Sequence, residues 1–531
     1  MRRLFPSSLI ALVVTGLFAA GLESECLADV RLPRIFTADM VLQRDQPIRV
    51  WGWADAGEEV RVSLADAAAT TTADARGRWG VELPARADGR GLELVVAGRN
   101  TIRLGNIVMG DVWLCGGQSN MEWSMAQSDA AADVAAATFP DIRRIKFNHV
   151  QSAVPADDAP AATPWQVCTP ATAGGFTAVG LFFAREVQAA TGVPIGLLDD
   201  NWGGTPIEPW IPPAGMELVP ELAGAVTARD KAIEAHRVAF STHLDAVERW
   251  LQASRVAMAA GGRPETLPAL PTPPGHPGAS GWGAMYRGMI HPLARFPVRG
   301  FLWYQGESNG GEGDSYRHKM QALVGGWRKA WGRDDLPFYF VQLASFQNPT
   351  DDPAGGDGWA RLREAQRHAL AVPRTGMAVI IDTVPLDARG DIHPRNKFDV
   401  GARLARWALH HDYGKRDVVP SGPLFKSVAF EGGKARVGFD HVGGGLIMGR
   451  KEGRAPAVEQ PGAALKRFAI AGEDRKWHWA EAAIDGDTVV VSSPAVPVPV
   501  AVRYAYSMNP DGANLYNRAG LPASPFRTDD W

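Results

Sequence analysis

A serine follows a short apolar run and two glycines near the end of the first quarter of the chain. The run Val112–Cys115 predicts a buried strand, and Gly116 and Gly117 allow a tight turn. From Asn120 onward the chain can continue as a helix. At such a strand-to-helix turn, Ser119 lies beside free backbone N–H groups that can stabilise an oxyanion, as acyl transfer requires. Ser119 is therefore a candidate nucleophile, with an ordinary turn residue as the alternative.

Nucleophilic catalysis also needs a base that takes the serine proton and an acid that orients the base. Asp391 and His393 are the candidates. Residues two apart in an extended loop project to the same side, so Asp391 can orient Nδ1 of His393 while Nε2 faces Ser119. Asp382 and Asp387 remain as alternative acids.

Three separated blocks, with a fourth near the start, carry a resemblance to a known family. They are Gly117-Gln118-Ser119-Asn120, Trp303-Tyr304-Gln305-Gly306-Glu307-Ser308-Asn309 and Asp391-Ile392-His393-Pro394-Arg395-Asn396-Lys397, preceded by residues 31–43. In this order the blocks resemble the sialate O-acetylesterase family, a branch of the SGNH-type carbohydrate esterases. The resemblance supports Ser119 and His393 as nucleophile and base. It supports Asp391 less, because the SGNH pattern places the acid three residues before the histidine, not two.

The oxyanion of acyl transfer needs several donors that converge on one point. We expect the N–H of Ser119, a glycine N–H from the segment 201–205, with that of Gly204 favoured, and a side-chain amide. The resemblance puts this amide in the block Trp303–Asn309, where Gln305 is favoured and Asn309 is the alternative. Glu307 is expected to hold that loop by accepting backbone N–H bonds. The wider set of substrate-binding or site-supporting residues is Gln118, Asn120, Glu307, Asn309, Trp202 and Arg395, and Lys397 joins Arg395 as a candidate partner of a sialate carboxylate.

Two other residues could carry the chemistry. Gly306-Glu307-Ser308-Asn309-Gly310 matches the G-x-S-x-G elbow of α/β-hydrolases, but the glycines that follow Ser308 are a poor start for the helix which that elbow needs. His291 is an alternative base, although a histidine that packs a loop is the simpler interpretation.

The elements around these residues predict an α/β fold. Short apolar runs at 193–198, 298–304, 337–343 and 377–381 alternate with helical patterns at 179–190, 316–327 and 359–370. We expect a three-layer α/β/α, SGNH-hydrolase-like domain with a mainly parallel sheet at 106–415, and the candidate residues at the carboxyl ends of its strands. A β-sandwich domain at 29–105 and a β domain at 416–531 flank it. A helical and Pro-rich insertion at about 212–280 is expected to flank the mouth of the site, with a lid as one role it could have.

Composition indicates an exported enzyme. Met1-Arg2-Arg3 and the apolar run from Leu9 to Ala20 predict a signal peptide at 1–28, and so a secreted or periplasmic protein with no membrane association after cleavage. The net charge of −3 over 531 residues argues against a nucleic-acid partner. The mature chain keeps Cys115 and Cys168, whose pairing the sequence leaves open.

These observations predict a carbohydrate O-acetylesterase that acts through a serine acyl-enzyme and needs no cofactor and no metal. The resemblance implies acetylated sialic acid as substrate. Acetylated xylan or another plant polysaccharide is the alternative substrate, and a non-catalytic carbohydrate-binding protein is the alternative class. The sequence does not determine the oligomeric state.

Overall fold

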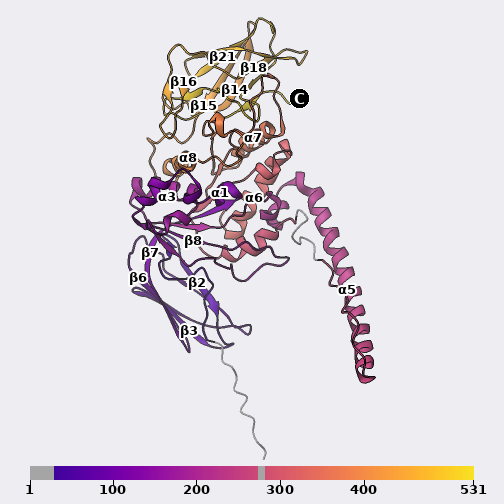
Figure 1. The fold of residues 1–531 in the computed structure, drawn as a ribbon. Helices are drawn as coiled ribbons and strands as arrows, with labels where there is room; N and C mark the ends of the chain where they lie inside the picture. Colours follow the sequence, from indigo (N-terminus) through magenta and orange to yellow (C-terminus); the bar gives the residue numbers. More distant parts are fainter. Residues whose placement is uncertain (1–28, 273–280) are drawn as a thin grey trace, which may run out of the picture.

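The computed structural model describes residues 29–272 and 281–531. A β-rich N-terminal part, a central α/β part and a C-terminal β part follow one another along the long axis of the molecule (Figure 1). The predicted signal peptide and residues 273–280 of the predicted insertion lie outside the described residues.

The N-terminal part consists of short strands that alternate buried and exposed side chains. In β3 and β5 every second residue is buried, which matches the period of two expected for strands with one face on a core. β2 pairs with β5, and β3 pairs with β4 and β6. The strands are β1 (Val41–Gln43), β2 (Ile48–Trp53), β3 (Glu59–Leu64), β4 (Ala67–Thr72), β5 (Arg78–Leu83) and β6 (Leu92–Ala97).

One long strand, β7 (Thr101–Gly117), connects this part to the central sheet. Its first half pairs antiparallel with β6, and its second half pairs parallel with strands of the central sheet. The predicted domain boundary between 105 and 106 therefore falls inside a continuous strand.

The central sheet has the strand order β13-β12-β11-β7-β10-β8-β9. Every neighbouring pair along this order is parallel except β8 with β9. The predicted mainly parallel sheet is therefore confirmed. Its further strands are β8 (Phe139–Lys146), β9 (Gln166–Cys168), β10 (Ile195–Asp199), β11 (Gly300–Tyr304), β12 (Phe338–Val341) and β13 (Thr375–Ala378).

Helices cover both faces of this sheet, and the strands are buried on both. Trp113 and Cys115 of β7 share a core with α3 (Ala178–Thr191) and α8 (Lys397–His411). The alternate residues Val112 and Leu114 share the opposite core with α6 (Tyr316–Trp331) and α7 (Gly358–His368). This is the expected three-layer α/β/α arrangement. Cys115 and Cys168 are both free and buried.

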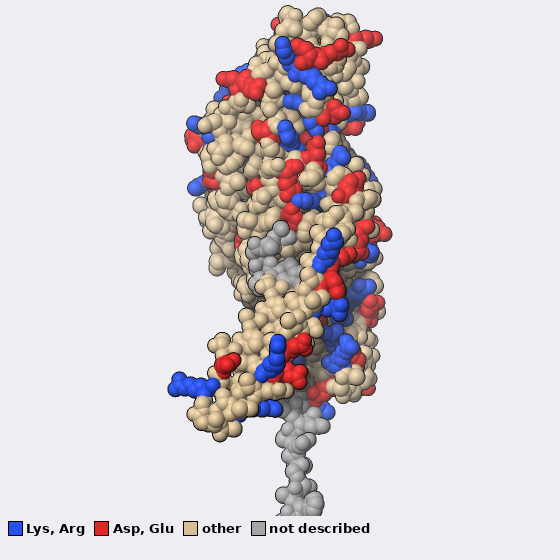
Figure 2. All heavy atoms as spheres, turned by 90° about the vertical axis from the view of Figure 1, so that its right-hand side faces the viewer, with Lys and Arg blue, Asp and Glu red and all other residues tan. Residues whose placement is uncertain are grey.

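The insertion contains the short α4 (Pro213–Met216) and the long α5 (Ala223–Ala259). α5 projects away from the body of the molecule (Figure 1). The expectation that this helix acts as a lid is therefore wrong for α5, which does not lie over the central sheet. Basic and acidic side chains are interspersed on the face that includes α5 (Figure 2), in keeping with the small net charge.

The C-terminal part contains two four-stranded sheets, β14-β15-β21-β20 and β19-β18-β22-β24, and a three-stranded sheet, β17-β16-β23. Its pairs are antiparallel. The strands are β14 (Leu424–Glu431), β15 (Lys434–Asp440), β16 (Leu446–Arg450), β17 (Val458–Glu459), β18 (Phe468–Ala471), β19 (Trp477–Trp479), β20 (Glu481–Asp485), β21 (Thr488–Ser492), β22 (Ala501–Tyr504), β23 (Leu515–Asn517) and β24 (Phe526–Arg527). In the described ranges, no helix has the length and apolar character that a membrane span needs.

Candidate active site

Ser119 is the first residue of α1 (Ser119–Glu122) and stands directly after β7. The turn before it is tight. Gly117 has φ 131°, and a Cβ there would lie 2.1 Å from the carbonyl oxygen of Tyr304 in the neighbouring strand. Glycine is therefore required to bring β7 this close to β11 and to turn into the helix. The half-buried Ser119 thus stands at the carboxyl edge of the sheet, as expected.

His393 reaches Ser119 from the loop between β13 and α8. Its Nε2 lies 2.9 Å from Oγ of Ser119, and its Nδ1 lies 3.5 Å from Oδ1 of Asp391. The same carboxylate oxygen accepts the backbone N–H of His393 at 2.8 Å. The imidazole stacks on Trp123, with ring centroids 4.8 Å apart and an angle of 17° between planes. The three residues predicted as nucleophile, base and acid are brought together in this order.

The surroundings of His393 favour its neutral form. Partial burial lowers its pKa below the ordinary value of 6.5, and the nearby Lys397 ammonium lowers it further. The carboxylate of Asp391 acts in the opposite direction but does not outweigh them. A neutral imidazole is the form that can accept a proton from serine.

A buried polar cluster supports the loop that carries His393. Asn120 is its centre, because its Nδ2 donates to Glu307 and to the carbonyl oxygen of Ile392, the residue before His393. Its Oδ1 accepts from the Nζ of Lys397. Asn120, Glu307 and Lys397 thus connect α1, the loop after β11 and the start of α8 beneath the reactive pair.

Burial changes the ionisation of this cluster. It lowers the pKa of Lys397 to about 7, although the carboxylates of Glu307 and Asp391 favour the charged form. It raises the pKa of Glu307, whose Oε2 is buried and has no hydrogen-bond partner among the described residues. The expectation that Lys397 contacts a substrate carboxylate is therefore wrong, because its side chain is fully buried.

The segment after β10 forms the other side of the site. Glu122 accepts the N–H of Gly203 at 2.7 Å, and its second oxygen lies 2.8 Å from Nε2 of His149. His149 in turn stacks on the half-buried Trp202, with centroids 4.6 Å apart. A Cβ on Gly203 would lie 3.2 Å from the Cβ of Ser119, so this turn passes directly beside the serine. Gly204 follows with φ 73°.

The structure corrects the prediction of a side-chain oxyanion donor. The Nε2 of Gln305 donates to the carbonyl oxygen of Thr205 and to Asn309, and the Nδ2 of Asn309 donates to Glu208 and Glu312. A primary amide has two N–H donors, so neither Gln305 nor Asn309 keeps one for a substrate. Both instead form a buried polar network below the loop.

The loop Gln305–Asn309 is held by Gln118 as well as by Glu307. The backbone N–H groups of Gly306 and Ser308 donate to Oε1 of Gln118, each at 3.3 Å. The Glu307 carboxylate accepts its own backbone N–H, in line with the prediction, and it also accepts from the side chain of Asn120. Gln118 and Asn120, on either side of Ser119, thus both connect the serine turn to this loop.

The alternative residues do not form a comparable site. Ser308 lies in a 3-10 turn, Glu307–Asn309, and no α-helix follows it directly. The base that would complete an elbow, His393, is bonded to Ser119. Asp382 forms an ion pair with Arg403 and is therefore engaged elsewhere. Burial lowers the pKa of His291, whose ring lies against Tyr286.

Glu122 and His149 are site residues that the sequence analysis did not select. Glu122 lies two residues after the block Gly117–Asn120 and three residues after Ser119, and the helical spacing that returns it toward the turn was a usable signal. His149 follows β8 in an irregular segment, and only the parallel pairing of β8 with β10 brings it to Trp202. Across residues 29–272 and 281–531, no group of three or more His, Cys, Asp or Glu could hold a metal ion.

The chain is similar to proteins of known activity and structure. Residues 109–253 and 271–410 match the family described as carbohydrate esterase, sialic acid-specific acetylesterase. The sialate O-acetylesterase of Rattus norvegicus is 30% identical over an alignment of 431 positions, which covers 73% of this chain and 74% of the relative. That of Mus musculus is 28% identical over an alignment of 535 positions, which covers 92% of each chain.

A solved structure extends the similarity to nearly the whole chain. The crystal structure of a carbohydrate acetylesterase from Xanthomonas citri matches with a TM-score of 0.77 and 40% sequence identity, over 95% of this chain and 100% of the other. Together with the family match and the identity to the rat enzyme, this similarity places the protein: it belongs to the carbohydrate esterase family of sialic acid-specific acetylesterases.

Proposed function

We propose that this chain removes acetyl groups from sugar hydroxyls, with Ser119 as nucleophile, His393 as general base and acid, and Asp391 as the residue that orients His393. The observation that carries the proposal is the 2.9 Å contact between Nε2 of His393 and Oγ of Ser119. This contact is what a serine needs to lose its proton as it attacks.

The reaction follows in two steps. Oγ of Ser119 attacks the acetyl carbonyl carbon while Nε2 of His393 accepts the hydroxyl proton. The bond from the carbonyl carbon to the sugar oxygen breaks, and that oxygen takes the proton from His393, which leaves an acetyl-serine. Water then attacks the acetyl-serine and gives its proton to His393, acetate leaves, and Ser119 regains its proton.

The developing oxyanion needs donors held in place before the reaction. We assign the backbone N–H groups of Ser119 and Gly204 to this role. The N–H of Ser119 belongs to the first turn of α1, where backbone donors have no partner within the helix. Glu122 fixes the turn that carries Gly204 by binding the N–H of Gly203. No side-chain amide is required in this scheme.

The proposed substrate is an acetylated sialic acid, in line with the substrate in the names of the rat and mouse relatives. We also propose that the chain is exported, on the basis of Met1-Arg2-Arg3 and the apolar run that follows. The alternative of a binding protein without catalysis has less support, because such a protein has no need of a serine bonded to a neutral histidine.

Release of acetate by the chain without residues 1–28 tests the proposal. Turnover of p-nitrophenyl acetate establishes an esterase, and acetate release from acetylated sialic acids, acetylated xylan and acetylated pectin fragments ranks the substrates. Absence of turnover on every one of these substrates would favour the binding protein. A higher kcat/KM on acetylated xylan than on acetylated sialic acids would make xylan the assigned substrate. The proposed serine mechanism would be unaffected.

A further inference from the structure

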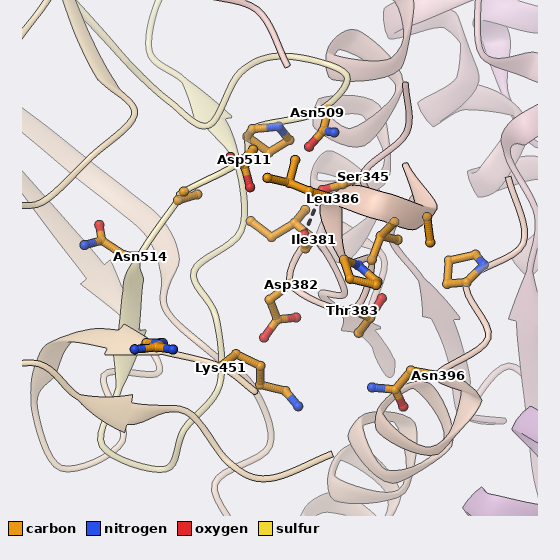
Figure 3. A pocket seen from close by; sticks show the side chains of 18 of the residues that line it. Ser345, Ile381, Asp382, Thr383, Leu386, Asn396, Lys451, Asn509, Asp511 and Asn514 are labelled. Carbon is orange, nitrogen blue, oxygen red and sulfur yellow. Dashed lines mark hydrogen bonds between the residues drawn. The ribbon is translucent and has the colours of Figure 1, made fainter. Parts of the chain in front are cut away.

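A cavity of about 830 Å³ lies between the central α/β part and the C-terminal β part (Figure 3). One wall is the segment 381–396, which includes Asp391 and His393. The opposite wall comes from residues 449–466 and 509–516 of the C-terminal part. Sites for small molecules span roughly 300–1000 Å³, so the cavity has the size of a ligand site.

The wall combines polar and apolar surface, and its inward charges are largely balanced. Asp382 pairs with Arg403, and Lys451 pairs with Asp399. Asn509 and Asp511 lie on the C-terminal side of the space in Figure 3. Carboxylates accept hydrogen bonds, and ammonium and guanidinium groups donate them; sugar hydroxyls need both kinds of partner.

Four charged side chains of the wall remain available to a ligand. Arg395 and Lys466 are exposed and form no ion pair within the part of the chain that the structure describes, and the carboxylates of Asp129 and Asp511 are likewise unpaired there. The mixture of signs disfavours a polyanion such as a nucleic acid. Leu386, whose side chain is 48% exposed, adds an apolar surface for the C–H face of a sugar ring.

We propose that this cavity binds the part of a glycan chain that adjoins the acetylated residue. The inference rests on the proposed function, because it takes Ser119 and His393 as the reacting pair. His393 belongs both to that pair and to the cavity wall, so a chain that occupies the cavity lies next to the site of acetyl transfer. The C-terminal β part then selects oligosaccharide over monosaccharide substrates.

A variant that fills the cavity tests this assignment. Ala463 is an exposed residue of the wall, and Ala463→Trp would occupy the space with an indole. Ala429→Trp, at an exposed position of β14 away from the cavity, is the matched control. With an acetylated oligosaccharide, Ala463→Trp should raise KM by at least about tenfold, while kcat/KM for p-nitrophenyl acetate stays at the wild-type value. An unchanged KM for the oligosaccharide would overturn the assignment.

Removal of single wall groups gives a finer test. Lys466→Ala and Asp511→Ala should each raise KM for the oligosaccharide by about three- to tenfold, the range of one lost hydrogen bond. Lys434→Ala, at an exposed lysine of β15, is the control and should leave KM unchanged. Equal effects of Lys466→Ala and Lys434→Ala would show that general charge, not this cavity, is responsible.

Direct binding separates this inference from the proposed function. We would titrate the same oligosaccharide without its acetyl groups into each protein and measure the heat of binding. It should bind the wild-type chain and should not bind Ala463→Trp. Binding that persists in Ala463→Trp, or no binding to the wild type, would refute the subsite. If the wild type binds this sugar but hydrolyses no acetyl ester, the proposed function fails and the subsite stands.

Discussion

The Nε2 atom of His393 lies 2.9 Å from Oγ of Ser119, although 274 positions separate the two residues in sequence. The parallel sheet explains this proximity. β7 and β13 lie in one sheet with β11 and β12 between them, and the loops after parallel strands emerge at the same edge. Asn120 then fixes the distance, because it binds the carbonyl oxygen of Ile392 from the helix that begins with Ser119.

The first prediction separates the two candidate serines. Ser119→Ala removes the attacking oxygen and should lower kcat on p-nitrophenyl acetate by at least about 10³-fold. Ser308→Ala should retain activity within a few-fold, since only the backbone N–H of Ser308 is used, by Gln118. A fluorophosphonate should label the peptide that carries Ser119. Labelling of Ser308, or the reverse ranking of the variants, would mean that the G-x-S-x-G elbow around Ser308 carries the nucleophile.

The second prediction concerns pH. Because burial and Lys397 lower the pKa of His393, the imidazole is neutral down to pH values below 6.5. The value of kcat/KM, which reports the ionisation of the free enzyme, should therefore rise with pH and level off, with a midpoint below pH 6.5. Measurement of kcat/KM for p-nitrophenyl acetate from pH 4 to pH 8 checks this. A midpoint above 6.5 would contradict the environment described for His393.

The third prediction addresses Asp391. In Asp391→Asn the negative charge that raises the pKa of His393 is lost, so the midpoint of the pH profile should move to lower pH. The plateau rate should fall by roughly 10- to 1000-fold, because the imidazole loses the group that orients it. Asp387→Asn, in the same loop, is the control and should change neither quantity. A wild-type rate in Asp391→Asn would show that Ser119 and His393 act without this acid.

The positions of the candidate catalytic residues were more predictable than those of the residues that support them. Ser119, Asp391 and His393 lie in short motifs after strands, and motif and topology together bring them to one edge. The oxyanion assignment to Gln305 failed for a physical reason. Gln305 is fully buried, and a buried amide satisfies its N–H groups with the nearest acceptors, here Thr205 and Asn309. No local pattern reports which acceptors the fold supplies.

Local patterns were also more predictable than long-range pairing among the elements of the fold. α3 extends one residue beyond the predicted range 179–190 at each end, because helical periodicity is a local property. The continuity of β7 was not predictable, since it depends on pairing with β6 on one side and β10 and β11 on the other. The division of the chain into domains at 105/106 and 415/416 stays a prediction.

The fourth prediction tests the turn that carries Gly204. Glu122→Ala removes the acceptor for the N–H of Gly203 and should lower kcat by about tenfold or more, with little change in KM, because the oxyanion donor is no longer held in place. Glu122→Gln keeps an acceptor oxygen and should recover much of the rate. His149→Ala removes only the second contact of Glu122 and should have a smaller effect than Glu122→Ala. A raised KM with an unchanged kcat in Glu122→Ala would assign Glu122 to substrate binding instead.

The last prediction uses the buried ammonium beside the base. Below its own pKa of about 7, Lys397 is mostly protonated and lowers the pKa of His393. In Lys397→Met this charge is absent, so the midpoint of the pH profile should move to higher pH, the opposite of the shift expected for Asp391→Asn. The variant also leaves Oδ1 of Asn120 without its donor, which costs about 1–3 kcal/mol of folding stability. Thermal unfolding measures that loss, and pH profiles recorded well below the unfolding temperature isolate the electrostatic effect. A midpoint that stays in place or moves down in Lys397→Met would show that the charge of Lys397 does not act on His393.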